Sequence, residues 1–314
     1  MKLILEHAEH ATELIRVMRF CATSGETLPD YTAGSHLEFD LGGVGKRAYS
    51  LVDWPTNSAN FSDRYTVAVQ QELAGDGGSQ VMHALSIGQD ITATKPKNSF
   101  NLVDGNRPVL LLAGGIGVTP LISMATQLQK EGRTFQLHYT ARNDSRMGFA
   151  DSLKNSFDSV VHFYLDDTNP LNLVSLMRLQ SPDTLVYLCG PRGMIDAARI
   201  AAIDAGIHEE AIHIELFSTP EIQVGDSAFE VEIGSTGQLV HVAADQSIIE
   251  ALEFAGIDVM YDCQRGDCGI CQCNVISGVP DHRDVVLSEA ERASGKVIQI
   301  CVSRAKSARL ILDV

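Results

Sequence analysis

The stretch Cys263-Gln-Arg-Gly-Asp-Cys268-Gly-Ile-Cys271, with Cys301 thirty residues further along, decides the fold of the last third of the chain. Its spacing is C-x4-C-x2-C followed by a distant cysteine. Plant-type [2Fe–2S] sites have this spacing, in which four thiolates hold two irons. The two glycines of the loop allow backbone N–H groups to point at sulfur, which tunes the reduction potential of a cluster. We therefore predict an iron–sulfur cluster with these four cysteines as its ligands.

The remaining cysteines help to choose between a metal site and disulfide bonds. The chain has seven cysteines, an odd number, and four of them fall within residues 263–273. In a cytosolic protein such a cluster indicates metal binding. A structural zinc site is the alternative, although such sites usually combine two C-x2-C pairs and this chain has one. Cys273 lies outside the ligand spacing, and we expect it to be a spare thiol that faces away from the metal.

Charge and hydropathy exclude several classes of protein. The chain of 314 residues has 40 acidic and 24 Lys or Arg side chains, a formal charge of −16. This argues against nucleic-acid binding, which needs a basic surface, and against docking on an anionic membrane. The chain has no apolar run of about 18 residues that could span a bilayer. The N-terminus, Met-Lys-Leu-Ile-Leu-Glu, meets a charge before a signal-peptide core can form, so we expect a cytoplasmic protein.

Turn signals divide the chain, whose length already suggests two or three domains. They lie at residues 104–108 and at 219–221. The predicted domains are residues 1–103, 104–224 and 225–314.

Each part has its own pattern of secondary structure. The first predicts short strands and one helix starting near residue 79, which suggests an antiparallel β-barrel. The second alternates strands with helices and predicts a doubly wound parallel sheet. The third opens with a hairpin. Expected strands are 36–40, 47–52, 65–69, 89–93, 109–113, 135–140, 160–165, 185–189, 212–217, 229–233, 238–242, 273–276, 297–300 and 310–312; expected helices include 120–130, 193–205 and 247–255.

A flavin site is predicted around Arg47-Ala48-Tyr49-Ser50. Such a site needs a cation for phosphate, an aromatic ring against the isoalloxazine and a small donor near its N5, and Arg47 and Tyr49 share one face of a strand. An ordinary surface strand is the alternative interpretation. Further contacts are expected from Val67 and Val69.

A glycine-rich turn, Gly75-Asp76-Gly77-Gly78-Ser79, follows that strand in sequence and opens a helix. Free N–H groups at Gly77, Gly78 and Ser79 suit the phosphate of the flavin. The alternative is an ordinary glycine turn in which Ser79 caps the helix.

A nucleotide site is predicted from Gly114-Gly115-Ile116-Gly117-Val118-Thr119-Pro120, which follows a strand and opens a helix. Its glycines would let the backbone approach a pyrophosphate, and proline suits the first helical turn. A bare glycine turn is the alternative, because the motif differs from the usual G-x-G-x-x-G.

A second piece of that site is Cys189-Gly190-Pro191-Arg192-Gly193-Met194, at the end of the fourth strand of the expected sheet, where ligands collect. A cysteine at a strand end is otherwise usually a packing residue. Asp166 and Asp167 would repel a 2′-phosphate and Arg142 could bind one, so the residues leave NADH and NADPH open.

The chain resembles a known family, first in the segments 278–288 and 301–305, which look like the ferredoxin domain of phthalate dioxygenase reductase and vanillate demethylase reductase relatives. The flavin and nucleotide motifs extend the resemblance over all three domains. It implies a multidomain α/β and β fold: an antiparallel flavin-binding β-barrel at 1–103, a doubly wound parallel-sheet NAD domain at 104–224 and a plant-type ferredoxin (β-grasp) domain at 225–314. Departures are a longer loop at 53–64 and the extra Cys273.

The resemblance also implies cofactors and roles. The domain order favours FMN, with FAD as the alternative, and the family favours NADH over NADPH. Cys189 and Thr119 would place the nicotinamide, Ser50 would hydrogen-bond near the flavin N5, and Phe217 would shield the flavin ring or serve as a core aromatic.

The implied activity is that of an NADH-dependent reductase, because a flavin accepts an electron pair and passes single electrons to a cluster. The implied acceptor is a separate Rieske non-heme iron oxygenase, on whose basic patch the acidic ferredoxin domain would dock. The alternatives are a P450 or a separate ferredoxin as acceptor, and an iron–sulfur or zinc protein that only senses redox state. We expect a monomer.

Overall fold

The computed structural model describes residues 1–23, 26–55, 63–219, 223 and 225–314. These residues form two compact units, Met1–Glu215 and Leu216–Val314, each described by itself below. Residues 220–221 of the expected domain boundary and most of the longer loop at 53–64 lie outside the described residues. In the described part of the chain, no helix has the length and apolar character needed to cross a bilayer.

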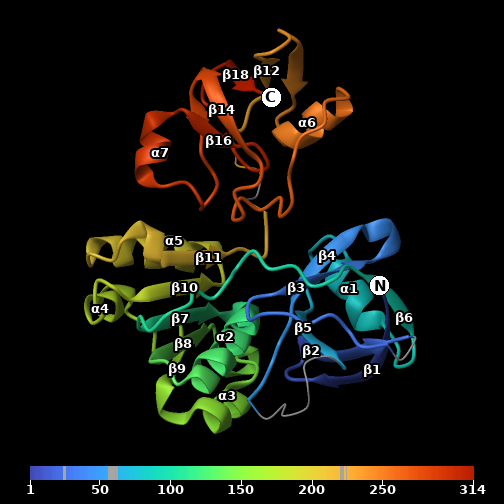
Figure 1. Ribbon diagram of the computed structural model, residues 1–314, viewed down its shortest axis with the longest axis vertical. Coiled ribbons are helices and arrows are strands. Elements are labelled where there is room, and N and C mark those ends of the chain that lie inside the picture. Colours follow the sequence, from blue (N-terminus) through green and yellow to red (C-terminus); the bar gives the residue numbers. More distant parts are fainter. Residues whose placement is uncertain (24–25, 56–62, 220–222, 224) are drawn as a thin grey trace. The chain divides into compact units, whose positions relative to one another are not determined.

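A six-stranded antiparallel sheet occupies the first part of the first unit (Figure 1). An isolated bridge between Leu51 and Val67 joins its two edges, so the sheet closes into a barrel. One short helix, α1 (Gly78–Ala84), follows the fifth strand. In spatial order the strands are β4 (Lys46–Ser50), β3 (His36–Asp40), β6 (Asp90–Ala93), β1 (Lys2–His10), β2 (Ile15–Ala22) and β5 (Tyr65–Gln70).

The strands β1 and β2 are longer than the short strands expected in this part. The register of β1 shifts between Leu5 and His7, which marks a β-bulge. In β2 the buried side chains are Ile15, Met18 and Phe20, a spacing that breaks strict alternation. Because these irregularities remove the period of two in the sequence, the pattern did not identify either strand.

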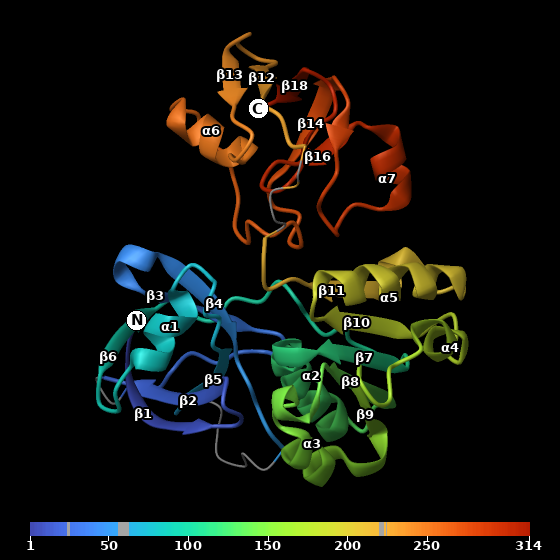
Figure 2. The ribbon, with the colours of Figure 1, turned by 180° about the vertical axis from the view of Figure 1, so that it is seen from behind.

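A five-stranded parallel sheet forms the rest of the first unit, in the order β11-β10-β7-β8-β9. The order reverses at β7, so right-handed crossovers place α2 and α3 on one face and α5 on the other (Figures 1 and 2). The doubly wound sheet is confirmed. The strands are β7 (Val109–Gly114), β8 (Phe135–Ala141), β9 (Val161–Leu165), β10 (Leu185–Cys189) and β11 (Ile212–Glu215), and the helices are α2 (Val118–Glu131), α3 (Ala150–Phe157), α4 (Leu173–Arg178) and α5 (Arg192–Asp204).

The barrel and the parallel sheet are joined through α2. The buried Ser123 hydroxyl donates to the Leu51 carbonyl at 2.7 Å and accepts from the Asp53 N–H at 2.9 Å. One turn further, the Thr126 hydroxyl donates to the Asp53 carbonyl at 2.8 Å. The helix that leaves the glycine loop of the sheet therefore holds the segment that leaves β4 of the barrel.

The second unit is built on a five-stranded mixed sheet in which β12 and β18 pair in parallel. Two helices flank this sheet on opposite sides in both views (Figures 1 and 2). The structure adds α7, which the pattern did not identify. The elements are β12 (Phe229–Ile233), β13 (Leu239–Val242), α6 (Ile248–Phe254), β14 (Gln272–Ser277), β15 (Pro280–Asp281), α7 (Glu289–Ser294), β16 (Val297–Gln299), β17 (Arg304–Ala305) and β18 (Arg309–Asp313).

We predict that Ser123→Ala lowers the free energy of unfolding by about 1–3 kcal/mol, because it removes both hydrogen bonds that the buried Ser123 hydroxyl makes to the Leu51 carbonyl and the Asp53 N–H. Ser145→Ala is the control, since Ser145 is exposed and such changes usually stay within about 0.5 kcal/mol. Chemical denaturation measures both. Equal losses for the two variants would contradict the role given to Ser123.

Candidate functional site

The nucleotide motifs meet at the carboxyl edge of the parallel sheet. Residues 114–117 follow β7 and residues 189–191 end β10, and these two strands are neighbours with Cys189 opposite Ala113. The strand order reverses between them, and open α/β sheets bind ligands at such a point. The structure thus brings together two motifs that lie over 70 residues apart in the sequence.

The two loops can touch because glycines, which have no side chain, lie where they meet. A Cβ on Gly117 would lie 2.4 Å from the Cys189 carbonyl oxygen, and one on Gly190 would lie 2.8 Å from the Gly114 backbone. A Cβ on Gly114 would meet Pro191 at 2.6 Å. These three glycines are therefore required for the contact between the loops. Gly115 differs: its φ is +55° and it faces open space, so it is free to approach a ligand.

The side chains beside the loops are already packed or bonded. The Thr119 hydroxyl donates to the Ile116 carbonyl at 2.9 Å and so steadies the turn into α2, where Pro120 occupies the first helical turn. Cys189 is fully buried at the end of β10. Met194, on α5, would be 2.9 Å from a Cβ on Gly114. Contact of Thr119 or Cys189 with a nicotinamide stays a prediction.

Two side chains of opposite charge follow the strands β8 and β9 of the parallel sheet. Arg142 directly follows β8 and Asp166 directly follows β9, and both are exposed. The Asp166 N–H donates to the Ala141 carbonyl at 3.1 Å, and the Thr140 hydroxyl donates to the Asp166 carboxylate at 3.3 Å. Asp166 is thereby held beside the end of β8, where a nucleotide ribose would be read.

The two predicted flavin motifs also meet. The Arg47 guanidinium lies 3.7 Å from the Asp76 carboxylate, and its stem would lie 2.7 Å from a Cβ on Gly78. Gly77, with a φ of +82°, is the N-cap of α1. The capping role considered for Ser79 is wrong: its hydroxyl instead accepts from the Glu72 N–H at 2.9 Å and closes the turn.

Tyr49, Val67 and Val69 are predicted to contact a flavin, and they differ in how far their side chains are buried. Tyr49 lies opposite Leu37, and its ring centroid is 6.0 Å from that of Phe39 at the edge of the barrel core. Burial raises the pKa of Tyr49 to about 12, so its phenol stays protonated at neutral pH. The side chains of Val67 and Val69 are buried in the barrel core. Their contact with a flavin would therefore come from the main chain.

Two further flavin residues occupy β4. Ala48 is half-buried and Ser50 is buried at the end of the strand, opposite His36. Phe217, expected near the flavin ring, lies just beyond β11 and is 42% exposed.

The four cysteines of the second unit converge. The thiols of Cys268 and Cys301 hydrogen-bond to Cys263 and lower the pKa of the Cys263 thiol. A hydrogen bond from Cys301 likewise lowers the pKa of Cys271. The Arg265 N–H donates to the Cys263 sulfur at 3.3 Å, as expected for a loop that presents N–H groups to thiolates. Four joined sulfurs with a main-chain donor fit a [2Fe–2S] cluster.

The shape of this loop depends on Gly266. Its φ is +83°, and a Cβ there would lie 2.7 Å from Val302 and 3.0 Å from Asp284. The Val285 N–H in turn donates to the Gly266 carbonyl at 2.9 Å. The segment after β15 is thus packed directly on the cysteine loop.

Asp284 is a functional residue that the sequence patterns left without a role. Its side chain is fully buried and accepts from the Leu287 N–H at 2.9 Å and from Arg292 at 3.1 Å. Ser303, two residues after Cys301, donates to it at 3.5 Å. Asp284 therefore ties the segment over the cysteine loop to the segment of the fourth cysteine. An aspartate between two motif segments is the signal that could have identified it.

Comparisons with known proteins agree with this geometry. Residues 231–306 match the family model described as a 2Fe-2S iron-sulfur cluster binding domain. The vanillate O-demethylase oxidoreductase of Pseudomonas sp. (strain HR199 / DSM 7063) is 38% identical over 303 residues, which cover 95% of this chain and 94% of that protein. The chain belongs to the family of vanillate O-demethylase oxidoreductase and phthalate dioxygenase reductase.

Solved structures extend the comparison to the fold of this reductase family. Phthalate dioxygenase reductase, described as a modular structure for electron transfer from pyridine nucleotides to [2Fe-2S], superposes with a TM-score of 0.73 and 32% identity, covering 100% of this chain and 98% of that one. An intact type IV self-sufficient cytochrome P450 monooxygenase matches with a TM-score of 0.77 and 34% identity. There the chain covers 41% of the larger protein. This reductase-family chain is an oxidoreductase.

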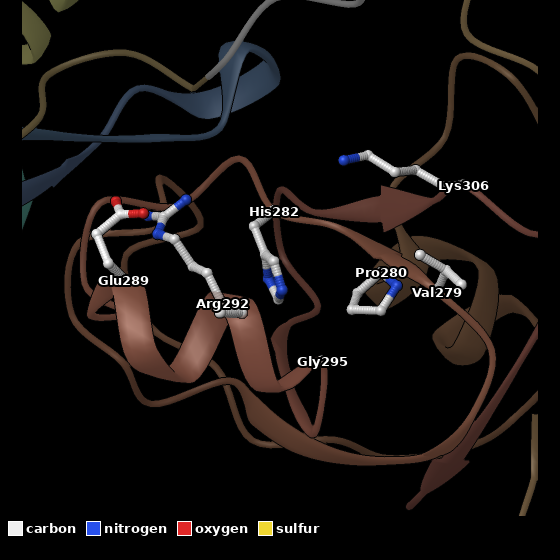
Figure 3. Close-up of a pocket in the computed structure, with 8 residues that line it drawn as sticks. Val279, Pro280, His282, Glu289, Arg292, Gly295 and Lys306 are labelled. Atoms are coloured by element: carbon white, nitrogen blue, oxygen red, sulfur yellow. The ribbon is translucent and has the colours of Figure 1, made fainter.

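A separate pocket in the second unit contains none of the predicted site residues (Figure 3). Its volume is about 470 Å³, and the side chain of His282 lies between Arg292 and Pro280. The His282 imidazole lies 4.0 Å from the Asp284 carboxylate, and burial is the main cause that lowers its pKa. The pocket is lined by Val279, Pro280, His282, Glu289, Arg292, Ala293, Gly295 and Lys306.

We predict that Gly117→Ala weakens binding of pyridine nucleotide and lowers the free energy of unfolding by about 1–3 kcal/mol, because the new methyl group forces the two loops apart. Gly132→Ala, at the C-cap of α2 and away from the two loops, is the matched control. It adds the same methyl group in open space and pays only the left-handed backbone cost of about 1–2 kcal/mol. Calorimetric titration with NAD+ and chemical denaturation test both variants. Unchanged nucleotide affinity in the Gly117 variant would contradict the role of the loop contact.

Proposed function

We propose that this chain is the NADH-dependent reductase component of an oxygenase system, which passes electrons through FMN and a [2Fe–2S] cluster to a separate Rieske-type oxygenase. The observation that carries the proposal is the convergence of Cys263, Cys268, Cys271 and Cys301 in one unit of the chain. The other unit contains the parallel sheet whose strand order reverses at the two glycine loops. One polypeptide thus has places for a two-electron donor and a one-electron carrier.

A bound flavin supplies the conversion between an electron pair and single electrons. The role of the protein is to hold and orient. Arg47, beside the turn of Gly77 and Gly78, supplies the positive charge for a flavin phosphate. FMN has one phosphate, which matches this single cation and turn, whereas FAD would need a second phosphate site. Ser79 closes the same turn through Glu72.

On the nucleotide side, the half-buried Gly115, whose α-carbon faces open space, would meet the pyrophosphate, and residues 190–191 with Met194 would form the opposing wall. Cys189 and Thr119 hold the shape of the two loops that would receive the nicotinamide. Ser50, at the end of β4, would be the donor near the flavin N5. Phe217, which is 42% exposed, would shield the flavin ring.

Asp166 selects NADH over NADPH in this proposal. Its carboxylate is exposed and held at the end of β8, where it would repel a 2′-phosphate, and the neighbouring Arg142 is left to contact the ribose side of NADH.

We expect Asp166→Asn to raise kcat/KM for NADPH about tenfold, or about 1.4 kcal/mol, and to leave that for NADH nearly unchanged, because the amide removes the repulsion. Asp204→Asn is the control, since Asp204 is exposed at the end of α5. Steady-state reduction of an artificial acceptor with each nucleotide measures the effect. The same ratio of NADPH to NADH activity in both variants would refute the assignment.

The proposed acceptor follows from the charge of residues 225–314 and from the related reductases. Residues 225–314 have 14 acidic and seven Lys or Arg side chains. Such an excess suits a basic docking surface on a partner and mainly speeds association. We propose a monomeric reductase that meets its oxygenase transiently. The similarity to a self-sufficient P450 supports a second candidate, in which the acceptor is a P450 heme domain.

The test of the function is a visible spectrum of the iron-supplemented protein before and after anaerobic NADH. Flavin bands and a broad iron–sulfur shoulder should both bleach, and the released flavin should be FMN. Cys301→Ser should lose the iron–sulfur absorbance and keep NADH-dependent flavin bleaching. Cys273→Ser, which changes a thiol outside the ligand set, should behave like the parent. A colourless parent protein would sink the proposal.

The rate at which the reduced protein passes electrons to each acceptor distinguishes the two candidates. The reduced protein is mixed with a Rieske-type oxygenase and, separately, with a P450 heme domain, and reoxidation is followed by stopped flow. Faster reoxidation by the Rieske protein, slowing as salt is added, is the expected result. Preference for the heme domain would support the second candidate.

A further inference from the structure

A buried glutamine lies against one of the cluster cysteines. Gln299 ends β16, two residues before Cys301, and is fully buried. The Cys271 thiol donates to its amide oxygen at 3.4 Å. Its amide nitrogen donates to the side-chain oxygen of Gln272 at 2.9 Å, across the β14–β16 pair. A buried, fully bonded amide thus connects the Cys271 sulfur to a side chain on the surface.

This arrangement suits a thiol and does not suit a thiolate. A metal-bound thiolate has no proton, so the Gln299 oxygen would face another acceptor in a buried place, which costs free energy. Rotation of the amide by 180° exchanges oxygen and nitrogen within nearly the same volume. The Gln299 N–H group then donates to the Cys271 sulfur.

Gln272 can accommodate that rotation. After it, the Gln299 oxygen faces Gln272, which must donate where it now accepts. Gln272 is exposed, so its own amide can turn at little cost and water satisfies its other atoms. The pair therefore has two complete hydrogen-bond patterns, one for each protonation state of Cys271.

We propose that Gln299 is a positioning residue that donates a hydrogen bond to the Cys271 thiolate of the [2Fe–2S] cluster and thereby raises its reduction potential. The inference rests on the proposed function, because it needs Cys271 as a ligand. A donor to a cluster sulfur favours the reduced, more negative state, and the burial of Gln299 keeps water from competing. The Arg265 N–H, which donates to the Cys263 sulfur, belongs to the main chain, and substitution leaves it in place.

The test compares Gln299→Leu with Gln272→Leu in the full-length holoprotein. Gln299→Leu keeps the size of the side chain and removes the donor. It should weaken reduction of the cluster about tenfold at equal driving potential, a shift of about 59 mV to more negative values for one electron. The midpoint is read by spectroelectrochemical titration, and resonance Raman follows the iron–cysteine stretches. Gln272→Leu should shift the midpoint much less, because Gln299 can still donate.

Iron content and the flavin midpoint serve as internal references and should stay at the parent values. If Gln299→Leu assembles no cluster, Gln299→Met, which is unbranched and also lacks a donor, takes its place. A cluster-bearing Leu or Met variant with the parent midpoint would overturn the inference and leave the proposed function intact. A parent protein that binds no iron would overturn both.

Discussion

The contact between two glycine loops is the constraint on which the first unit depends. Because Gly114, Gly117 and Gly190 lack side chains, the ends of β7 and β10 touch, and α2 starts from that contact. The same helix holds the end of the barrel strand β4 through Ser123. One rigid helix therefore relates the nucleotide loop to the strand proposed to hold the flavin. Hydride transfer needs such a relation, since misplacement of the reacting atoms by about 1 Å can cost a hundredfold in rate.

The second unit uses a different device to hold its site. A buried carboxylate, Asp284, joins the segment over the cysteine loop to the segment that contains Cys301, and Gly266 lets the two pack closely. Fully bonded polar groups of this kind specify a single arrangement, because an unpartnered buried group is costly. The cysteines proposed as cluster ligands are therefore positioned by hydrogen bonds between residues that are far apart in sequence.

Gln299 adds a tuning element to this scaffold. The loop offers main-chain donors, whose number is set by its conformation, whereas the side chain of Gln299 is open to variation without changing the loop. Reductases that share one fold can deliver electrons to different acceptors if the potential of the cluster is adjusted in this way. The acidic surface of residues 225–314 acts on a separate quantity, the rate of encounter with the acceptor.

The sequence by itself determined what depends on local spacing: the cysteine pattern, the glycine loops that open helices, the strand–helix alternation and the family. These features are local because a loop that wraps a cluster or a phosphate needs particular residues at fixed separations. The tertiary structure alone decided which glycines serve loop packing and which face a ligand, that Gly77 and not Ser79 is the N-cap of α1, and that Asp284 and Gln299 adjoin the cysteines. Most of those relations join residues far apart in the chain, and the bulge in β1 hides even local periodicity. Only folding shows which distant atoms compete for the same space and hydrogen bonds.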